Sequence, residues 1–307
     1  MYMSDKSVTK KFALREFSII GIIISLYAFF ALYLPYIFEK FVDIENIQIL
    51  NNLSMDVYLT FRIVCIVFAS FVPFLALYAS DRKYHDKNSN KERASLKDCL
   101  IYTLVFITVS SLFTYINSSV LSFFNVSSSL VSNIGLAIDS KYFDDILYIC
   151  IYIIILPIFE EFAFRASLLG SLGKYGKRFA VLTCSLIYAL AHCNITEILP
   201  SLIMSYLLCK VYLKYRSLIL TSFIHIVYNL IMFLGFSISS EYNKYVLLFI
   251  FTIILITILI VLLKKYTPIL LPKADFNKNT FWLFLSRKTV IFSLLLFITF
   301  AVLQIVI

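Results

Sequence analysis

Two adjacent carboxylates and an arginine lie within one of the most apolar stretches of the chain. Glu160, Glu161 and Arg165 follow the uncharged run "ILYICIYIIILPIF", and the sequence stays apolar to Gly170. A charged side chain inside a membrane is costly, so such residues are rare and usually serve a function. This stretch is therefore the first candidate for a functional site.

Three pairs of polar residues in apolar segments have a spacing of four residues. Residues at this spacing share one face of an α-helix. Each pair therefore forms a polar stripe that we expect to face the interior of a helix bundle. Helix rise places the three stripes at a similar depth in the membrane. The pairs are Glu161 with Arg165, Tyr188 with His192, and His225 with Asn229.

Each of these residues also has a purely structural interpretation, as an ion pair or as a hydrogen bond between membrane helices. Such roles do not require two carboxylates and two histidines at one depth. A glutamate with histidines can hold and deprotonate water. Alternatively, Glu160, His192 and His225 can bind Zn²⁺. An asparagine amide one turn from a histidine can stabilise an oxyanion. The set is typical of water-mediated amide hydrolysis, with or without a metal.

The two carboxylates are expected to play different parts. Successive residues of an α-helix point about 100° apart, so Glu160 and Glu161 should not face the same partner directly. Glu161 shares its stripe with Arg165, which nearly cancels its charge. Glu160 has Phe164 at the corresponding position. We therefore predict that Glu160 is an unpaired base and that Glu161 supports the structure.

The composition is that of a membrane protein. Of the 307 residues, 61% are hydrophobic and 15% are charged, and the mean hydropathy is +0.90. The predicted fold class is all-α: a polytopic transmembrane helical bundle of about eight or nine spanning helices, each with about 20 apolar residues. The first apolar run is too long for a cleavable signal peptide. The predicted spans are 17–38, 57–79, 99–124, 146–170, 178–194, 197–215, 217–237, 245–263 and 290–307.

The positive charges indicate a topology. They concentrate in alternate loops, most densely at 82–97 and 264–288, and the intervening loops, such as "CNITE", are acidic or neutral. This alternation predicts a multi-pass protein of the cell membrane with a cytoplasmic N-terminus. It also accounts for the net charge of +9 without a nucleic-acid partner.

Several other polar or aromatic residues have structural interpretations. Trp282 is expected to anchor the last span at the membrane interface. Arg62, near the outer end of the second span, is expected to extend its charge to water, and His85 to be solvated in a charged loop. The six cysteines form no C-x-x-C pair, which indicates free thiols and neither disulfides nor a zinc cluster.

Three short motifs carry a family resemblance. "EEFAFR" fits E-E-x-x-x-R, "YALAH" fits F-x-x-x-H with Tyr188 in place of Phe, and "HIVYN" fits H-x-x-x-N. In this order they resemble the motifs of the CPBP intramembrane proteases, which include CAAX prenyl endopeptidases and bacteriocin-processing or self-immunity proteins. The resemblance divides the chain into N-terminal transmembrane helices (1–145), a CPBP-like core (146–237) and C-terminal transmembrane helices (238–307).

The resemblance implies a helix bundle with a water-accessible cavity and peptide-bond hydrolysis. Glu160 would hold the attacking water with His192. His225 and Asn229 would polarise the carbonyl or form the oxyanion hole. Glu161 would support the site together with Arg165. The resemblance leaves open whether Zn²⁺ is bound or whether glutamate-activated water suffices.

The expected function is an intramembrane endopeptidase that cleaves a membrane-associated or exported peptide, such as a bacteriocin, a pheromone precursor or a leader. The alternative is an immunity or scaffold protein of the same fold that acts by binding. A proton-coupled transporter would also use Glu and His, but the inverted repeats typical of transporters were not found in the sequence. The expected partners are a peptide or membrane-protein substrate and the lipid bilayer, and the oligomeric state is not predicted.

Overall fold

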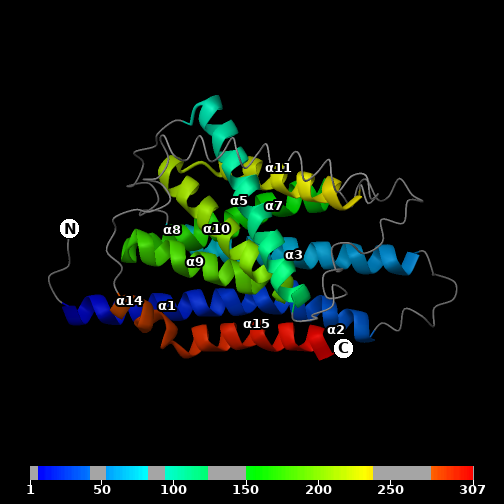
Figure 1. Cartoon of the computed structure of the whole chain (residues 1–307). Coiled ribbons are helices and arrows are strands. Elements are labelled where there is room, and N and C mark those ends of the chain that lie inside the picture. The colour runs from blue at the N-terminus through cyan, green and yellow to red at the C-terminus, as the bar shows by residue number, and fades with distance from the viewer. Residues whose placement is uncertain (1–5, 42–52, 82–93, 124–149, 238–277, 307) are drawn as a thin grey trace.

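The computed structural model describes residues 6–41, 53–81, 94–123, 150–237 and 278–306, and every secondary-structure element within them is a helix (Figure 1). The longer helices are α1 (Lys6–Ala28), α3 (Leu53–Ser80), α5 (Leu96–Phe123), α9 (Lys177–Ala191), α10 (Ile195–Tyr215), α11 (Leu218–Ser237) and α15 (Lys288–Val306). The shorter ones are η1 (Phe29–Tyr33), α2 (Leu34–Phe41), η4 (Ile151–Ile155), α7 (Leu156–Glu161), η5 (Phe162–Leu169), α8 (Gly170–Leu172), η6 (Gly173–Tyr175) and α14 (Lys278–Leu285). The described residues confirm an all-α fold.

Two helices from opposite ends of the chain, α1 and α15, lie side by side (Figure 1). Gly21 permits this contact, because a Cβ there would lie only 2.6 Å from the backbone nitrogen of Val290. Small residues allow such close approach of membrane helices. Two hydrogen bonds join the pair: Arg287 Nε donates to Ser18 Oγ at 2.9 Å, and Thr289 Oγ1 donates to the Ser18 carbonyl at 3.0 Å.

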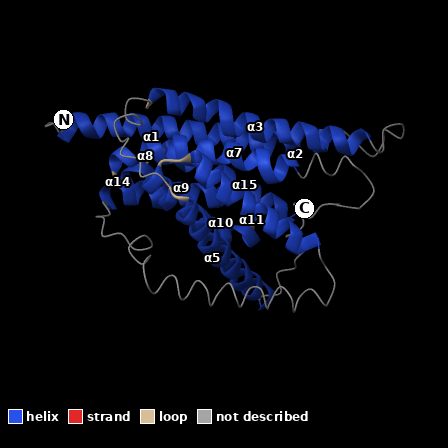
Figure 2. Ribbon diagram, turned by 90° about the horizontal axis from the view of Figure 1, so that it is seen from above, coloured by secondary structure: helices blue, strands red, loops and turns tan. Residues whose placement is uncertain are grey.

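The central helices α9 and α10 form a hairpin, and α5 crosses obliquely beside α10 (Figure 2). The turn between α9 and α10 is tight, since Cys193 has a left-handed φ of 50°. Non-glycine residues adopt this conformation rarely. The Cys193 thiol donates to the carbonyl of Leu190 at 3.2 Å and to that of Phe297 at 3.4 Å, which holds the turn against α15. This turn brings the first residues of α10 close to the end of α9.

The helix that carries the two carboxylates is not a regular α-helix. It passes from the π-helix η4 into α7 and then into the eight-residue π-helix η5. Pro157 has no N–H and its ring crowds the preceding turn, which disfavours regular α-helix there. π-Helical turns are rare and frequently lie at functional sites. Ser167 of η5 donates to the carbonyl of Phe74 in α3 at 2.6 Å, and this bond fixes the segment in the bundle.

The end of this helix is held by a cluster of charged side chains. Lys174 Nζ lies 2.8 Å from Asp81 Oδ1, at the end of α3, and 2.7 Å from Glu16 Oε2 in α1. The Tyr175 hydroxyl donates to the same Glu16 carboxylate. Burial and this hydrogen bond raise the pKa of Tyr175 well above its usual range. The cluster therefore links the turn before α9 to two other helices.

The described residues contain four helices long and apolar enough to cross a membrane: Lys10–Phe38, Thr60–Ser80, Leu96–Thr114 and Glu197–Tyr215. The bent pair Lys278–Leu285 and Lys288–Leu303, with an angle of 73°, would make a fifth. Large apolar side chains face outward, for example Val64 and Phe68 of α3 and Phe292 and Leu295 of α15. The chain is thus a multi-pass membrane protein, but the predicted total of eight or nine spans is not confirmed.

Several predictions concern residues that the structure does not describe. They are the span 245–263, the position of His85 and the two boundaries of the core domain (145/146 and 237/238), which lie on or beside undescribed residues. The helix at the predicted span 178–194 ends three residues before the end of that span, because α9 ends at Ala191. Trp282 lies in α14 and is exposed, as an interfacial anchor requires.

Candidate active site

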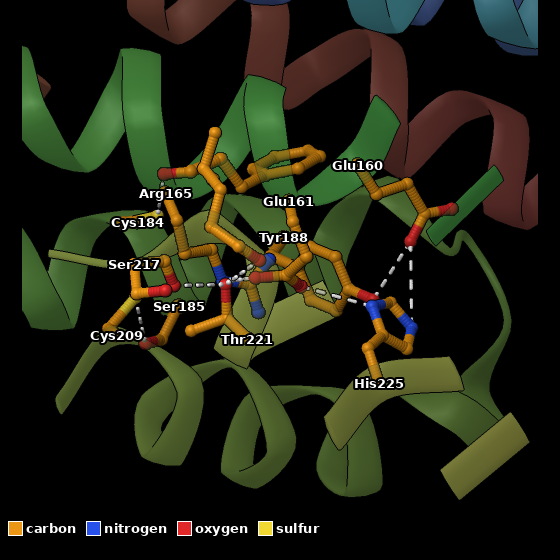
Figure 3. A network of polar contacts seen from close by, with 12 residues as sticks. Glu160, Glu161, Arg165, Cys184, Ser185, Tyr188, Cys209, Ser217, Thr221 and His225 are labelled. Carbon is orange, nitrogen blue, oxygen red and sulfur yellow. Dashed lines mark hydrogen bonds and ion pairs between the residues drawn. The ribbon is translucent and has the colours of Figure 1, made fainter. Parts of the chain in front are cut away.

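The imidazole of His225 lies between the two carboxylates (Figure 3). Its Nδ1 is 3.0 Å from Glu161 Oε1, and its Nε2 is 3.9 Å from Glu160 Oε2. A carboxylate oxygen only accepts hydrogen bonds, so Nδ1 carries the proton of the neutral ring and Nε2 presents a lone pair. The expectation that the carboxylates could not face one partner is therefore wrong. An imidazole has nitrogens on two edges, so a single ring can contact both.

Glu161 also forms the predicted ion pair with Arg165. Arg165 Nε lies 3.2 Å from Glu161 Oε2, and both side chains are fully buried. This contact confirms that Glu161 and Arg165 share one face of their helix. Glu161 does more than balance this charge, because its second oxygen holds His225. It connects a buried cation to the ring that faces Glu160.

The guanidinium of Arg165 has a second partner in an aromatic ring. Its Cζ lies 4.6 Å from the centroid of the Tyr188 ring, a distance at which a cation is attracted to the ring face. Neither terminal nitrogen of Arg165 has a hydrogen-bond partner among the described residues. Glu161 and the ring of Tyr188 are therefore the main electrostatic compensation of this charge within the described part of the chain.

Glu160 lies at the more open side of the site. Its side chain is 22% exposed, whereas that of Glu161 is 0% exposed. The expectation that Glu160 is unpaired is also wrong: the Tyr188 hydroxyl donates to Glu160 Oε2 at 3.1 Å. The partner comes from α9, and a comparison of positions within one helix could not have found it.

His192 directly follows α9 as its C-terminal cap. Its Nδ1 lies 2.9 Å from the carbonyl oxygen of Tyr188, and the two rings pack edge to face at 4.8 Å. Because a carbonyl only accepts, Nδ1 carries the proton and Nε2 presents a lone pair. The stripe predicted for Tyr188 and His192 is thus confirmed. The backbone of α9 sets the tautomer of the histidine.

Glu197 belongs to the same cluster, although its position between the loop "CNITE" and the predicted span 197–215 did not indicate a role in the site. It lies in the first turn of α10, where it interacts electrostatically with His192, Glu160 and Arg62 of α3. Asn194 Nδ2 donates to Glu197 Oε1 at 3.3 Å. An Asn followed three residues later by Glu is a helix-start pattern. That pattern could have placed Glu197 one turn into α10 and close to His192.

Asn229 is the one predicted site residue that the structure does not join to the others. It lies one turn after His225 on α11 and is half-buried. Within the described ranges its amide makes no hydrogen bond to another site residue. Its role at an oxyanion stays a prediction.

Glu160, His192 and His225 are the side chains predicted to bind zinc if a metal is used. Zn²⁺ requires ligand atoms about 2.0–2.2 Å from one point. Glu160 Oε2 and His225 Nε2 are 3.9 Å apart, a distance that two ligands of one ion can span after a small adjustment. In the part of the chain that the structure describes, no group of three or more His, Cys, Asp or Glu side chains converges closely enough to hold a metal ion. Zinc binding by Glu160, His192 and His225 therefore stays a prediction.

Residues 142–231 match the model of the type II CAAX prenyl endopeptidase Rce1-like family. The match supports the predicted CPBP membership for this segment of the chain. The CPBP match takes in all three motifs and all six predicted site residues, and it covers less than a third of the chain. No curated protein and no solved structure matched the sequence.

The match connects the geometry to a type of chemistry, since the matched model describes endopeptidases. The buried carboxylates and histidines lie within the CPBP-matching segment. Tyr188 stands where the CPBP motif usually has Phe. Its hydroxyl is therefore a feature of this chain beyond the family pattern.

Proposed function

We propose that the protein is an intramembrane endopeptidase that hydrolyses a peptide bond with a water molecule activated by Glu160. The observation that carries this proposal is the placement of His225. One edge of the ring is held by the buried Glu161, and the other faces the partly exposed Glu160. A general base and a positioned imidazole at one opening suit water-mediated amide hydrolysis.

The first step is attack of water on the scissile carbonyl. Glu160 removes a proton from the water, and the new bond joins the water oxygen to the carbonyl carbon. The Nε2 lone pair of His192 can accept the second hydrogen of the water and so fix its orientation. The carbonyl oxygen becomes an oxyanion.

The second step needs a donor for that oxyanion. His225 serves when its ring is protonated, because Nε2 then carries a hydrogen while Nδ1 stays bonded to Glu161. The negative charge of Glu161 stabilises this imidazolium, as a buried carboxylate does for other catalytic histidines. Asn229, one turn further on α11, would supply a second donor. Glu160 then returns its proton to the leaving amine as the C–N bond breaks.

The substrate is proposed to be a membrane-associated or exported peptide, such as a bacteriocin, a pheromone precursor or a leader. We further propose a cytoplasmic N-terminus, because of the basic loops at 82–97 and 264–288. Cysteines introduced at Ser89 and Ser129 should then react with an impermeant reagent from opposite sides of the membrane. Equal labelling of both from one side would overturn this orientation.

The function is tested by comparing cells that produce the wild-type protein with cells that produce Glu160→Gln. The peptides of the membrane and medium are measured by mass spectrometry, and at least one product should disappear in the variant. Asp98→Asn is the matched control, since Asp98 caps the start of α5 through Ser95 and lies outside the site. Identical peptide profiles for wild type and Glu160→Gln would favour the binding protein.

The same assay tests the metal. Glu160 and water suffice for the proposed steps, so cleavage by purified protein should persist in a strong chelator. Loss of cleavage in the chelator and its recovery with Zn²⁺ would instead show that a metal takes part, with Glu160, His192 and His225 as its proposed ligands.

A further inference from the structure

We propose that the hydroxyl of Tyr188 positions the catalytic base Glu160 and leaves one carboxylate oxygen for water. This inference rests on the proposed function. The hydroxyl donates to Glu160 Oε2 at 3.1 Å, and the same oxygen faces His225 Nε2. Among the described residues no hydrogen bond reaches Oε1. The two oxygens are thus distinguished, and Oε1 is the one that receives the proton of the water.

The ring that carries this hydroxyl is immobilised on several sides. Tyr188 is 1% exposed. Phe164 packs edge to face against it at 4.9 Å, with the two rings perpendicular, and the ring of His192 contacts it at 4.8 Å. Close packing leaves a side chain few alternative rotamers. The hydroxyl therefore occupies a fixed point on α9 from which it can hold a carboxylate on α7.

The guanidinium over the ring strengthens this donor. Arg165 lies 4.6 Å from the ring centroid. A cation on the ring face is attracted to its electron density, and it polarises the phenol so that the O–H becomes a better donor. A hydrogen bond to an ionised carboxylate is also stronger than a neutral one. Arg165 thus acts on Glu160 through Tyr188, in addition to its ion pair with Glu161.

The F-x-x-x-H motif separates the role of the Tyr188 ring from that of its hydroxyl. A Phe at this position would keep the packing of the ring but could not contact Glu160. The hydroxyl is therefore an addition that this chain makes to the motif, and its effect is separable from that of the ring. Tyr188→Phe removes the donor alone.

The experiment compares purified wild type, Tyr188→Phe and Tyr215→Phe. Tyr215 is the matched control, because it is also buried and lies under a cation, Lys214 at 4.8 Å, at the far end of α10. For Tyr188→Phe we expect kcat to fall roughly tenfold, the scale of one lost hydrogen bond to a charged group. KM and the melting temperature in detergent should stay unchanged. Tyr215→Phe should behave as wild type in all three.

A spectroscopic arm tests the contact without relying on cleavage. The infrared carboxylate band of Glu160 is assigned from the difference between wild type and Glu160→Gln, and it should shift in Tyr188→Phe. If wild type cuts no peptide but the band shifts, the proposed function fails and the contact stands. An unshifted band overturns the inference. A shifted band with unchanged kcat also overturns the inference. A fall in kcat that is accompanied by a lower melting temperature overturns it as well.

Discussion

The carboxylates on the two sides of the His225 ring differ in burial, and this difference suggests a structural role for one and a chemical role for the other. On the inner side, Glu161 and Arg165 are fully buried and bound to each other. On the outer side, Glu160 is partly exposed and shares its surroundings with His192 and Glu197. A buried charge that loses its partner destabilises the fold, whereas a general base must be in contact with water. Two neighbouring carboxylates in one helix thus serve different purposes because their environments differ.

The largest effect on rate is expected from the outer side. Glu160→Gln keeps the shape and can still accept from Tyr188, but it removes the base. A general base contributes typically 10²–10⁴-fold, so kcat should fall by about that factor while the melting temperature stays near that of wild type. Cleavage rates and melting curves in detergent provide the check. A variant that still cuts at a substantial rate would show that Glu160 is not the base.

The largest effect on stability is expected from the inner side. Arg165→Gln leaves the carboxylate of Glu161 buried without its cation, and Glu161→Gln leaves the guanidinium over Tyr188 without its anion. Removing one member of a buried pair typically costs 3–5 kcal/mol. Both variants should therefore melt at lower temperature and accumulate less in membranes, and both should lose activity.

The double variant sharpens this comparison. Glu161→Gln with Arg165→Met removes both charges, so it should recover part of the stability lost by either single change. It should stay inactive, because His225 no longer has an anion on Nδ1. Recovery of cleavage in the double variant would mean that Glu161 serves only to balance Arg165.

Contacts within one helix could be predicted from the sequence, and contacts between helices could not. The four-residue spacing gave the pairing of Glu161 with Arg165 and the stripe of Tyr188 and His192. It could not give the hydrogen bond from Tyr188 to Glu160, because the rotation of α9 against α7 depends on packing across the bundle. The π-helical turns of η4 and η5 have no period that a pattern search detects.

The position of Glu197 was missed for a related reason. The length of an apolar run fixes the end of a span only to within a few residues, so Glu197 falls in the sequence at the boundary between the loop "CNITE" and the span 197–215. The left-handed turn at Cys193 and the cap from Asn194 draw this segment to the site instead. Likewise, the predicted number of spans depends partly on 245–263, which lies outside the described ranges.

The smallest of these effects is expected at Glu197, which touches the outer side by charge alone. Its carboxylate stabilises a positive charge on His192 and repels that of Glu160. Glu197→Gln keeps an acceptor for Asn194 but removes this charge. Among the described residues no hydrogen bond joins Glu197 to His192 or Glu160, so only a charge interaction at longer range is lost, about a kcal/mol. We therefore expect kcat to fall roughly 2- to 5-fold, with an unchanged melting temperature.

The matched variant for this prediction is Asn194→Ala. It removes the hydrogen bond of 3.3 Å to Glu197 but keeps the carboxylate. Loss of an Asn at a helix start costs about 0.5–2 kcal/mol, so the melting temperature should fall while kcat stays near wild type. The two variants thus separate charge from capping. If Asn194→Ala lowers kcat as much as Glu197→Gln does, Glu197 acts by fixing the start of α10, and the outer side of the site has one carboxylate that matters for chemistry instead of two.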